Sequence, residues 1–158
     1  MSGHTATGTG LVLGSEEADA VVVAARGYAA ALPPDRAAPY EALARAAADG
    51  RIPDDLVDAA ERVTAISLQT GRARQDGHAA AERLLSAVYR RTPAGQVLAN
   101  RVEEVNQALR ALAGRRLRTA RAAASAPGCY TLTLEADSAT VTLTVDAAGI
   151  GVRSLQVG

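Results

Sequence analysis

The segment that organises the fold covers residues 92–114 and reads TPAGQVLANRVEEVNQALRALAG. Thr92 is suited to cap a helix, Pro93 fits the first helical position, and Gly114 fits the position after the last turn. Between them, apolar residues recur at spacings of four and three, which places them on one stripe of a helix: Leu98, Val102, Val105, Leu109 and Leu112. The stripe predicts a helix buried along one side, and it carries packing information rather than chemistry.

Four more helices are expected before this segment. Apolar residues with helical spacing predict them over residues 15–32, 36–49, 53–68 and 78–91. Ser15 is a candidate N-cap for the first, Pro33-Pro34 ends it, and Gly50 ends the second. Residues 72–76 are polar and fit either a frayed helix end or a loop.

After Gly114 the apolar period changes to two, which is typical of strands with one buried face. A turn at Asp137-Ser138 aligns residues 130–135 with residues 140–145 as a hairpin. In that register every inward apolar residue has an apolar partner: Leu134 with Val141, Leu132 with Leu143, and Tyr130 with Val145. The pattern therefore predicts both the pairing and its register.

The segments on either side of this hairpin complete the expected sheet. Residues 117–124 fit an edge strand or a helix, and the turn signal Pro127-Gly128 favours the strand. In the last strand, Ile150 and Val152 share the apolar face, whereas Leu155 and Val157 have the opposite parity. A β-bulge near Arg153–Ser154 would return both to that face, so we predict one there.

Together these patterns predict an α+β fold. An N-terminal helical half of about five helices (residues 15–114) would pack on a C-terminal antiparallel β-meander of three to four strands (residues 115–158). The two halves are expected to form a single domain over residues 15–158. Residues 1–14 are rich in Gly, Thr and Ser and are expected to form a flexible tail.

Composition excludes several kinds of chemistry. All seventeen basic side chains are Arg, so no lysine Schiff base, P-loop lysine or lysine general base is possible. Cys129 is the single cysteine, so no intrachain disulfide forms. With no signal-peptide pattern and no apolar run of membrane-spanning length, we expect a cytoplasmic protein, and the Ala and Arg bias indicates a high-GC bacterial source.

No catalytic or metal-binding motif is recognisable, so we expect a protein that is not an enzyme, with no cofactor and no metal site. His4 and His78 have no carboxylate or cysteine at ligand spacing. Cys129 enters a strand after a turn glycine, which fits a structural thiol better than a nucleophile.

Two sets of surface residues remain as candidate interaction sites. The first is an arginine group within the basic segment 72–121: Arg90, Arg91, Arg115, Arg116, Arg118 and Arg121. The second is the polar face of the expected hairpin: Thr131, Thr133, Thr140, Thr142 and Thr144. Solvated surface explains either set. The alternative for the arginines is a face that binds nucleic acid or an acidic partner, and the alternative for the threonines is a covering partner or a second copy.

The residues 91–93, 105–109 and 130–145 resemble small α+β accessory proteins of high-GC bacteria. Our leading hypothesis is a non-catalytic accessory or adaptor protein that acts through contact with another protein or with itself. The alternative is a nucleic-acid-associated regulator that uses the Arg-rich segment, although aromatic residues for base stacking are scarce. A weaker alternative is a small-molecule sensor with a pocket between helices and sheet; no membrane association is expected.

Overall fold

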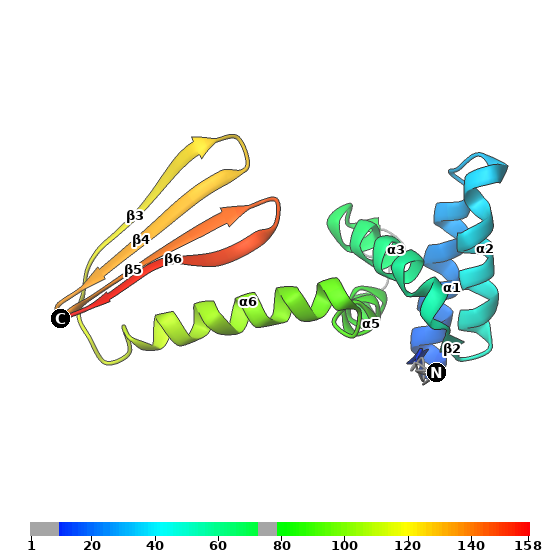
Figure 1. Ribbon diagram of the computed structural model, residues 1–158, viewed down its shortest axis with the longest axis horizontal. Coiled ribbons are helices and arrows are strands. Elements are labelled where there is room, and N and C mark those ends of the chain that lie inside the picture. The colour runs from blue at the N-terminus through cyan, green and yellow to red at the C-terminus, as the bar shows by residue number, and fades with distance from the viewer. Residues whose placement is uncertain (1–9, 73–78) are drawn as a thin grey trace, which may run out of the picture. The chain divides into compact units, whose positions relative to one another are not determined.

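The computed structural model describes residues 10–72 and 79–158, and it divides into two compact units. Unit 1 comprises residues 1–96 and unit 2 comprises residues 97–158. Helices make up most of unit 1, and a four-stranded antiparallel sheet makes up most of unit 2 (Figure 1). The predicted α+β class, with helices first and the β-meander last, is therefore confirmed; the expectation of a single domain stays a prediction.

Unit 1 contains the four expected helices. They are α1 (Ser15–Ala29), α2 (Pro34–Ala48), α3 (Val57–Gln69) and α5 (Ala79–Tyr89), and the short 3-10 helix η1 (Asp54–Leu56) leads into α3. Their buried residues form one core in which alanine is prominent. The rings of Tyr28 and Tyr40 pack edge to face, with their centroids 4.6 Å apart. Apart from Arg72, the polar segment 72–76 lies outside the described residues, as does His78.

The expectation of a flexible tail is wrong for residues 10–14. Leu11–Val12 forms strand β1, which pairs with β2 (Arg51–Ile52), and the Leu13 side chain is buried in the core of unit 1. Gly10 makes this pairing possible, because a Cβ there would lie 2.2 Å from the Ile52 carbonyl oxygen. The apolar run from Leu11 to Leu13 is only three residues long, and the Gly and Thr residues before it led to the prediction of a tail.

The cap of α1 also differs from the prediction. The N-cap residue is Gly14 rather than Ser15. The Gly14 N–H donates to the Glu17 carboxylate over 3.1 Å, so a side chain three residues into the helix supplies the acceptor.

Helix α6 (Pro93–Arg110) begins as predicted. The Thr92 side chain is buried, and its Oγ1 accepts the Gly95 N–H over 3.2 Å. The Ala94 N–H, another free amide of the first turn, donates to the Glu61 carboxylate of α3 over 2.9 Å. Gly95 lies against the end of α5, where a Cβ would be 1.8 Å from the Tyr89 carbonyl oxygen. The start of α6 is thus fixed by a cap and a close backbone contact.

The sheet of unit 2 runs in the order β3-β4-β5-β6, with every pair antiparallel. The strands are β3 (Leu117–Ala126), β4 (Cys129–Ala136), β5 (Ala139–Asp146) and β6 (Gly149–Val157). Tyr130 pairs with Val145, Leu132 with Leu143, and Leu134 with Val141. The predicted hairpin register is confirmed, and the ambiguous segment 117–124 is a strand.

The predicted bulge in the last strand is confirmed. Thr142 pairs with Ser154 and Leu143 pairs with Val152, so Arg153 is the extra residue. Leu155 then pairs with Val141, which brings it to the apolar face. Leu155 remains exposed there, as does Val157. The bulge therefore turns both side chains to the apolar face but does not bury them.

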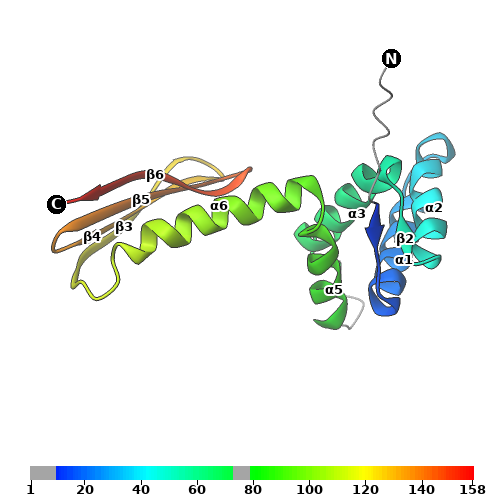
Figure 2. The ribbon, with the colours of Figure 1, turned by 60° about the horizontal axis from the view of Figure 1, so that its bottom comes forward.

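The apolar stripe of α6 is buried over only part of its length. Val105 is 4% exposed, whereas Leu98 is 36% and Val102 is 40% exposed. The core of unit 2 centres on Val105, Ala108, Val141 and Leu143, with Leu109 and Leu112 packed against it. The expectation that all five stripe residues would be buried is therefore wrong for the first two. Figure 2 shows the sheet layered on one side of α6.

Candidate protein-interaction surface

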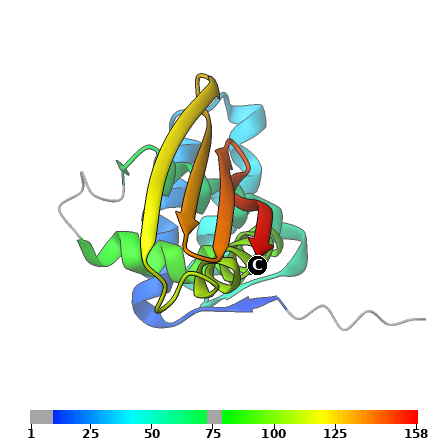
Figure 3. The same ribbon diagram turned by 90° about the vertical axis from the view of Figure 1, so that its left-hand side faces the viewer.

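The sheet of unit 2 is wider than the helix that covers it. Four strands spaced ~4.8 Å apart exceed the ~10 Å width of one helix. The core beneath α6 draws Val141 and Leu143 from β5, Ile150 and Val152 from β6, and only Leu132 from β4. Figure 3 shows β3 at the sheet edge, away from α6. The apolar face is consequently open on the β3 side.

Strand β3 is exposed at each of its ten residues. Ala120, Ala122 and Ala124 pair with Leu134, Leu132 and Tyr130, so these three alanines lie on the apolar face of the sheet. Next to them, Tyr130 is 50% exposed. Small side chains on this edge leave the backbone accessible to another strand. We call residues 119–125, together with Tyr130, the β3 edge surface.

The opposite edge of the sheet is interrupted in its middle. Strand β6 carries the bulge at Arg153, and Ile150 and Val152 pack against the core beneath α6. Bulges and coverage are the usual means by which proteins block unwanted strand pairing. Strand β3 is regular between Thr119 and Ala124, with irregularities only near its ends. Of the two edges, β3 thus offers the longer uninterrupted stretch to another strand.

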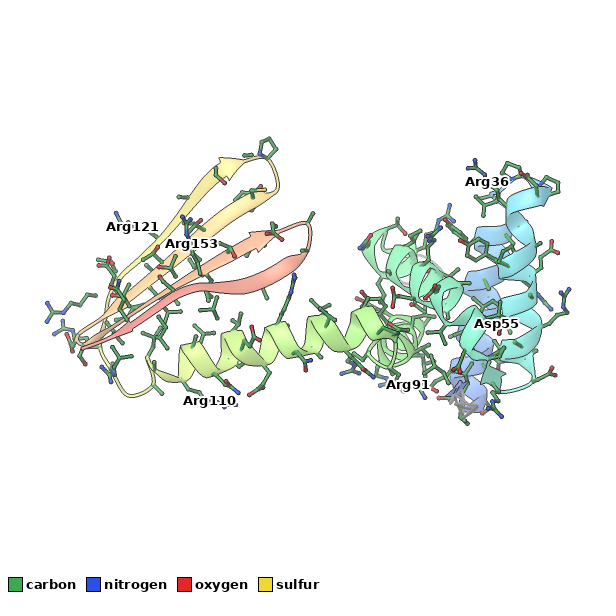
Figure 4. The ribbon with its side chains drawn as sticks, viewed as in Figure 1. Arg36, Asp55, Arg91, Arg110, Arg121 and Arg153 are labelled. Atoms are coloured by element: carbon green, nitrogen blue, oxygen red, sulfur yellow. The ribbon has the colours of Figure 1, made fainter. Side chains whose placement is uncertain are left out.

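The β3 arginines are engaged with carboxylates of the same sheet. Arg118 Nε lies 2.7 Å from Asp137, and Arg121 Nη2 lies 3.8 Å from Glu135, whose carboxylate also accepts the Thr119 hydroxyl over 2.8 Å. These pairs are exposed, so each contributes about 1 kcal/mol or less. Their main effect is to balance the positive charge beside β3. Figure 4 shows Arg121 on this strand.

The remaining arginines of the predicted group are divided between the two units. Arg91 acts inside unit 1, where it lies 2.6 Å from Glu17 and donates to the Val12 carbonyl over 2.7 Å. Arg90 belongs to the same unit and is exposed, whereas Arg115 and Arg116 belong to unit 2. Arg115 donates to the Ser138 hydroxyl. Arg91 is therefore a structural residue that ties α5 to the start of α1.

The threonines lie together on the other face of the sheet, as predicted. Thr131 pairs with Thr144 and Thr133 with Thr142, and both pairs are half-buried, as is Thr140. This face also holds Thr119 and Arg121 of β3. It is polar and partly charged, in contrast to the open alanine side of the same strand.

A half-open groove of about 720 Å³ lies among α1, α3 and α5 of unit 1. Apolar side chains line most of it, including Ala20, Val23, Ile66 and Leu84. Charged residues of both signs border it: Glu16, Asp19, Arg72 and Arg83. A volume of this size suits a small molecule, yet no buried polar group of the described residues points into the groove without a partner.

Neither unit has the charge typical of a nucleic-acid-binding module. Unit 2 contains seven Arg and five acidic residues, and unit 1 contains ten Arg and twelve acidic residues. Within the described part of the chain, no three His, Cys, Asp or Glu side chains are grouped to hold a metal ion. Cys129 is a half-buried free thiol. No helix of residues 10–72 and 79–158 has the length and apolarity to cross a membrane.

Comparison with protein-family models, curated proteins and solved structures finds no match to this chain.

Proposed function

We propose that this protein is a non-catalytic accessory protein that acts by binding another protein chain through the β3 edge surface. The observation that supports this proposal is a ten-residue edge strand exposed throughout, next to a part of the apolar face that α6 leaves uncovered. Addition of a strand to such an edge gives affinity through main-chain hydrogen bonds. The bacterial cytoplasm is the proposed site of action.

Charge pairing favours a protein partner over nucleic acid. Binding to phosphates requires cations that are available to neutralise them. Arg118 and Arg121 instead pair with Asp137 and Glu135. A protein strand on this edge would contact backbone and alanine, and it would leave these ion pairs in place.

Capture of bound molecules from the source cells tests the proposal. The tagged full chain is compared with Ala122→Lys, which places a charge in the β3 edge surface, and with Ala113→Lys, the same change at an exposed residue outside the sheet. We expect a defined protein to stay bound to the unsubstituted chain and to Ala113→Lys through nuclease treatment and high salt, and to be lost from Ala122→Lys. Retention of nucleic acid alone, released by modest salt, would instead support the regulatory alternative.

A further inference from the structure

We infer that the partner of the β3 edge surface is the β3 strand of a second copy of this chain, paired antiparallel about a two-fold axis at Ala122. The inference rests on the proposed function and specifies its partner. The resulting sheet would be continuous across both copies, with β3 beside β3 at its centre. Such an interface uses the same surface on both subunits, as two-fold symmetric dimers do.

The sheet geometry limits the possible registers. In an antiparallel pair, residues directly opposite each other point to the same face of the sheet, and faces alternate with residue number. When the two strands are identical, the two numbers in each pair must therefore both be odd or both be even. The two-fold axis then passes through a residue rather than between two residues. On the regular part of β3, the candidate centres are therefore Arg121, Ala122 and Ala123.

Charge and length select among these centres. An axis at Arg121 would place two arginines directly opposite each other, which destabilises an antiparallel pair. An axis at Ala123 would pair only residues 122–124 within the regular part of β3. The axis at Ala122 pairs residues 120–124 and places Arg121 opposite Ala123.

The side chains fit this register on both faces. On the apolar face, Ala122 meets its own copy and Ala120 meets Ala124, so no bulky group separates the backbones. On the polar face, Arg121 lies opposite Ala123 of the second copy. The small Ala123 leaves room for the long Arg121 side chain, which already reaches Glu135 of its own chain. The strand is thus complementary to itself.

The charges beside β3 also favour a second copy of this chain over a strongly charged partner. Every carboxylate beside β3, Asp137 and Glu135, already has an arginine of β3 as its partner. A strand with its own charges paired and alanine at alternate positions matches another strand of that kind. Association would then be insensitive to salt over the range that screens surface charges.

Cysteine scanning of the full chain tests both the partner and the register. In a Cys129→Ser background, Ala122→Cys is expected to form a disulfide-linked dimer under mild oxidation, because cross-strand Cα atoms lie about 4.5–5.5 Å apart. Ala120→Cys and Ala124→Cys should each stay monomeric alone, since equivalent residues would be about 13 Å apart along the strands. Mixed together, these two variants should crosslink to each other.

Sedimentation equilibrium provides the measurement without a crosslink. The unsubstituted chain is expected to pass with concentration from 16.1 kDa toward twice that mass. Ala122→Lys should raise the dissociation constant about fivefold or more, because two lysines would face each other. Ala113→Lys serves as the matched control and should leave that constant unchanged.

Two results would overturn the inference. Crosslinking through Arg121→Cys but not Ala122→Cys would refute the register. A mass of 16.1 kDa at all concentrations, with no disulfide-linked dimer of any variant, would refute the second copy as partner. In that second case a different protein captured through the β3 edge surface would leave the proposed function standing, so the two failures are distinguishable.

Discussion

Truncation of Leu143 is expected to destabilise unit 2 while leaving the stability of unit 1 unchanged. Leu143 is 2% exposed and lies in a core with four buried members: Val105, Ala108, Val141 and Leu143 itself. Leu-to-Ala changes at such sites cost about 2–5 kcal/mol. A unit of 62 residues, from 97 to 158, has a total stability of roughly 3–9 kcal/mol. Leu143→Ala therefore removes a large share of that stability.

Amide hydrogen exchange measures this loss locally. A cost of 2 kcal/mol corresponds to about 30-fold faster exchange through the unfolded state. We expect this acceleration in peptides from β4, β5 and β6, with peptides from α1, α2 and α3 unchanged. Leu98→Ala is the matched control, because Leu98 is 36% exposed and its truncation should cost only about 1.5 kcal/mol. Equal effects of the two variants, or equal acceleration in both units, would refute the reasoning.

Three further predictions concern a helix cap, a close backbone contact and an ion pair in unit 1. Thr92→Ala should lower the free energy of unfolding by about 1 kcal/mol through loss of the α6 cap, whereas Thr92→Ser should retain most of it in urea denaturation. Gly95→Ala should prevent normal folding, because its Cβ would overlap the Tyr89 carbonyl oxygen. Gly27→Ala has open space around the new Cβ and should stabilise α1 by about 0.5–1 kcal/mol. Similar circular dichroism melts for the two variants would contradict this prediction. Glu17→Gln should cost about 1 kcal/mol by weakening the pair with Arg91, and a cost that persists unchanged in high salt would show that the lost interaction is not electrostatic.

Local patterns were sufficient for most of the fold. The hairpin register followed from the apolar alternation of β4 and β5, since a one-residue slip would invert a whole face. The bulge at Arg153 followed from the parity change of Leu155 in the same way. Both are consequences of a period of two, which the sequence displays directly.

Other features depend on contacts between distant segments. Strand β1 forms because Gly10 admits the backbone of Ile52, a partner some forty residues away that no local pattern indicates. The open part of the sheet depends on where α6 lies across the strands, whereas the stripe of α6 is uniform along its length.

The candidate surface was therefore only partly predictable. Arg118 and Arg121 were recognisable as a charged group, but their pairing with Asp137 and Glu135 required the register of β3 on β4. The alanines of β3 carried no signal in the sequence, because alanine is abundant throughout and favours helix. Their importance comes from their position at an uncovered edge.

The most direct test of the β3 edge surface is photocrosslinking in the source cells. A benzophenone amino acid replaces Ala122 in one strain and Ala113 in the other, so that both probes occupy exposed positions of unit 2. We expect a discrete protein adduct at Ala122, identified by mass spectrometry, and none at Ala113. Absence of a protein adduct at Ala122, or the same adduct at both positions, would contradict this expectation.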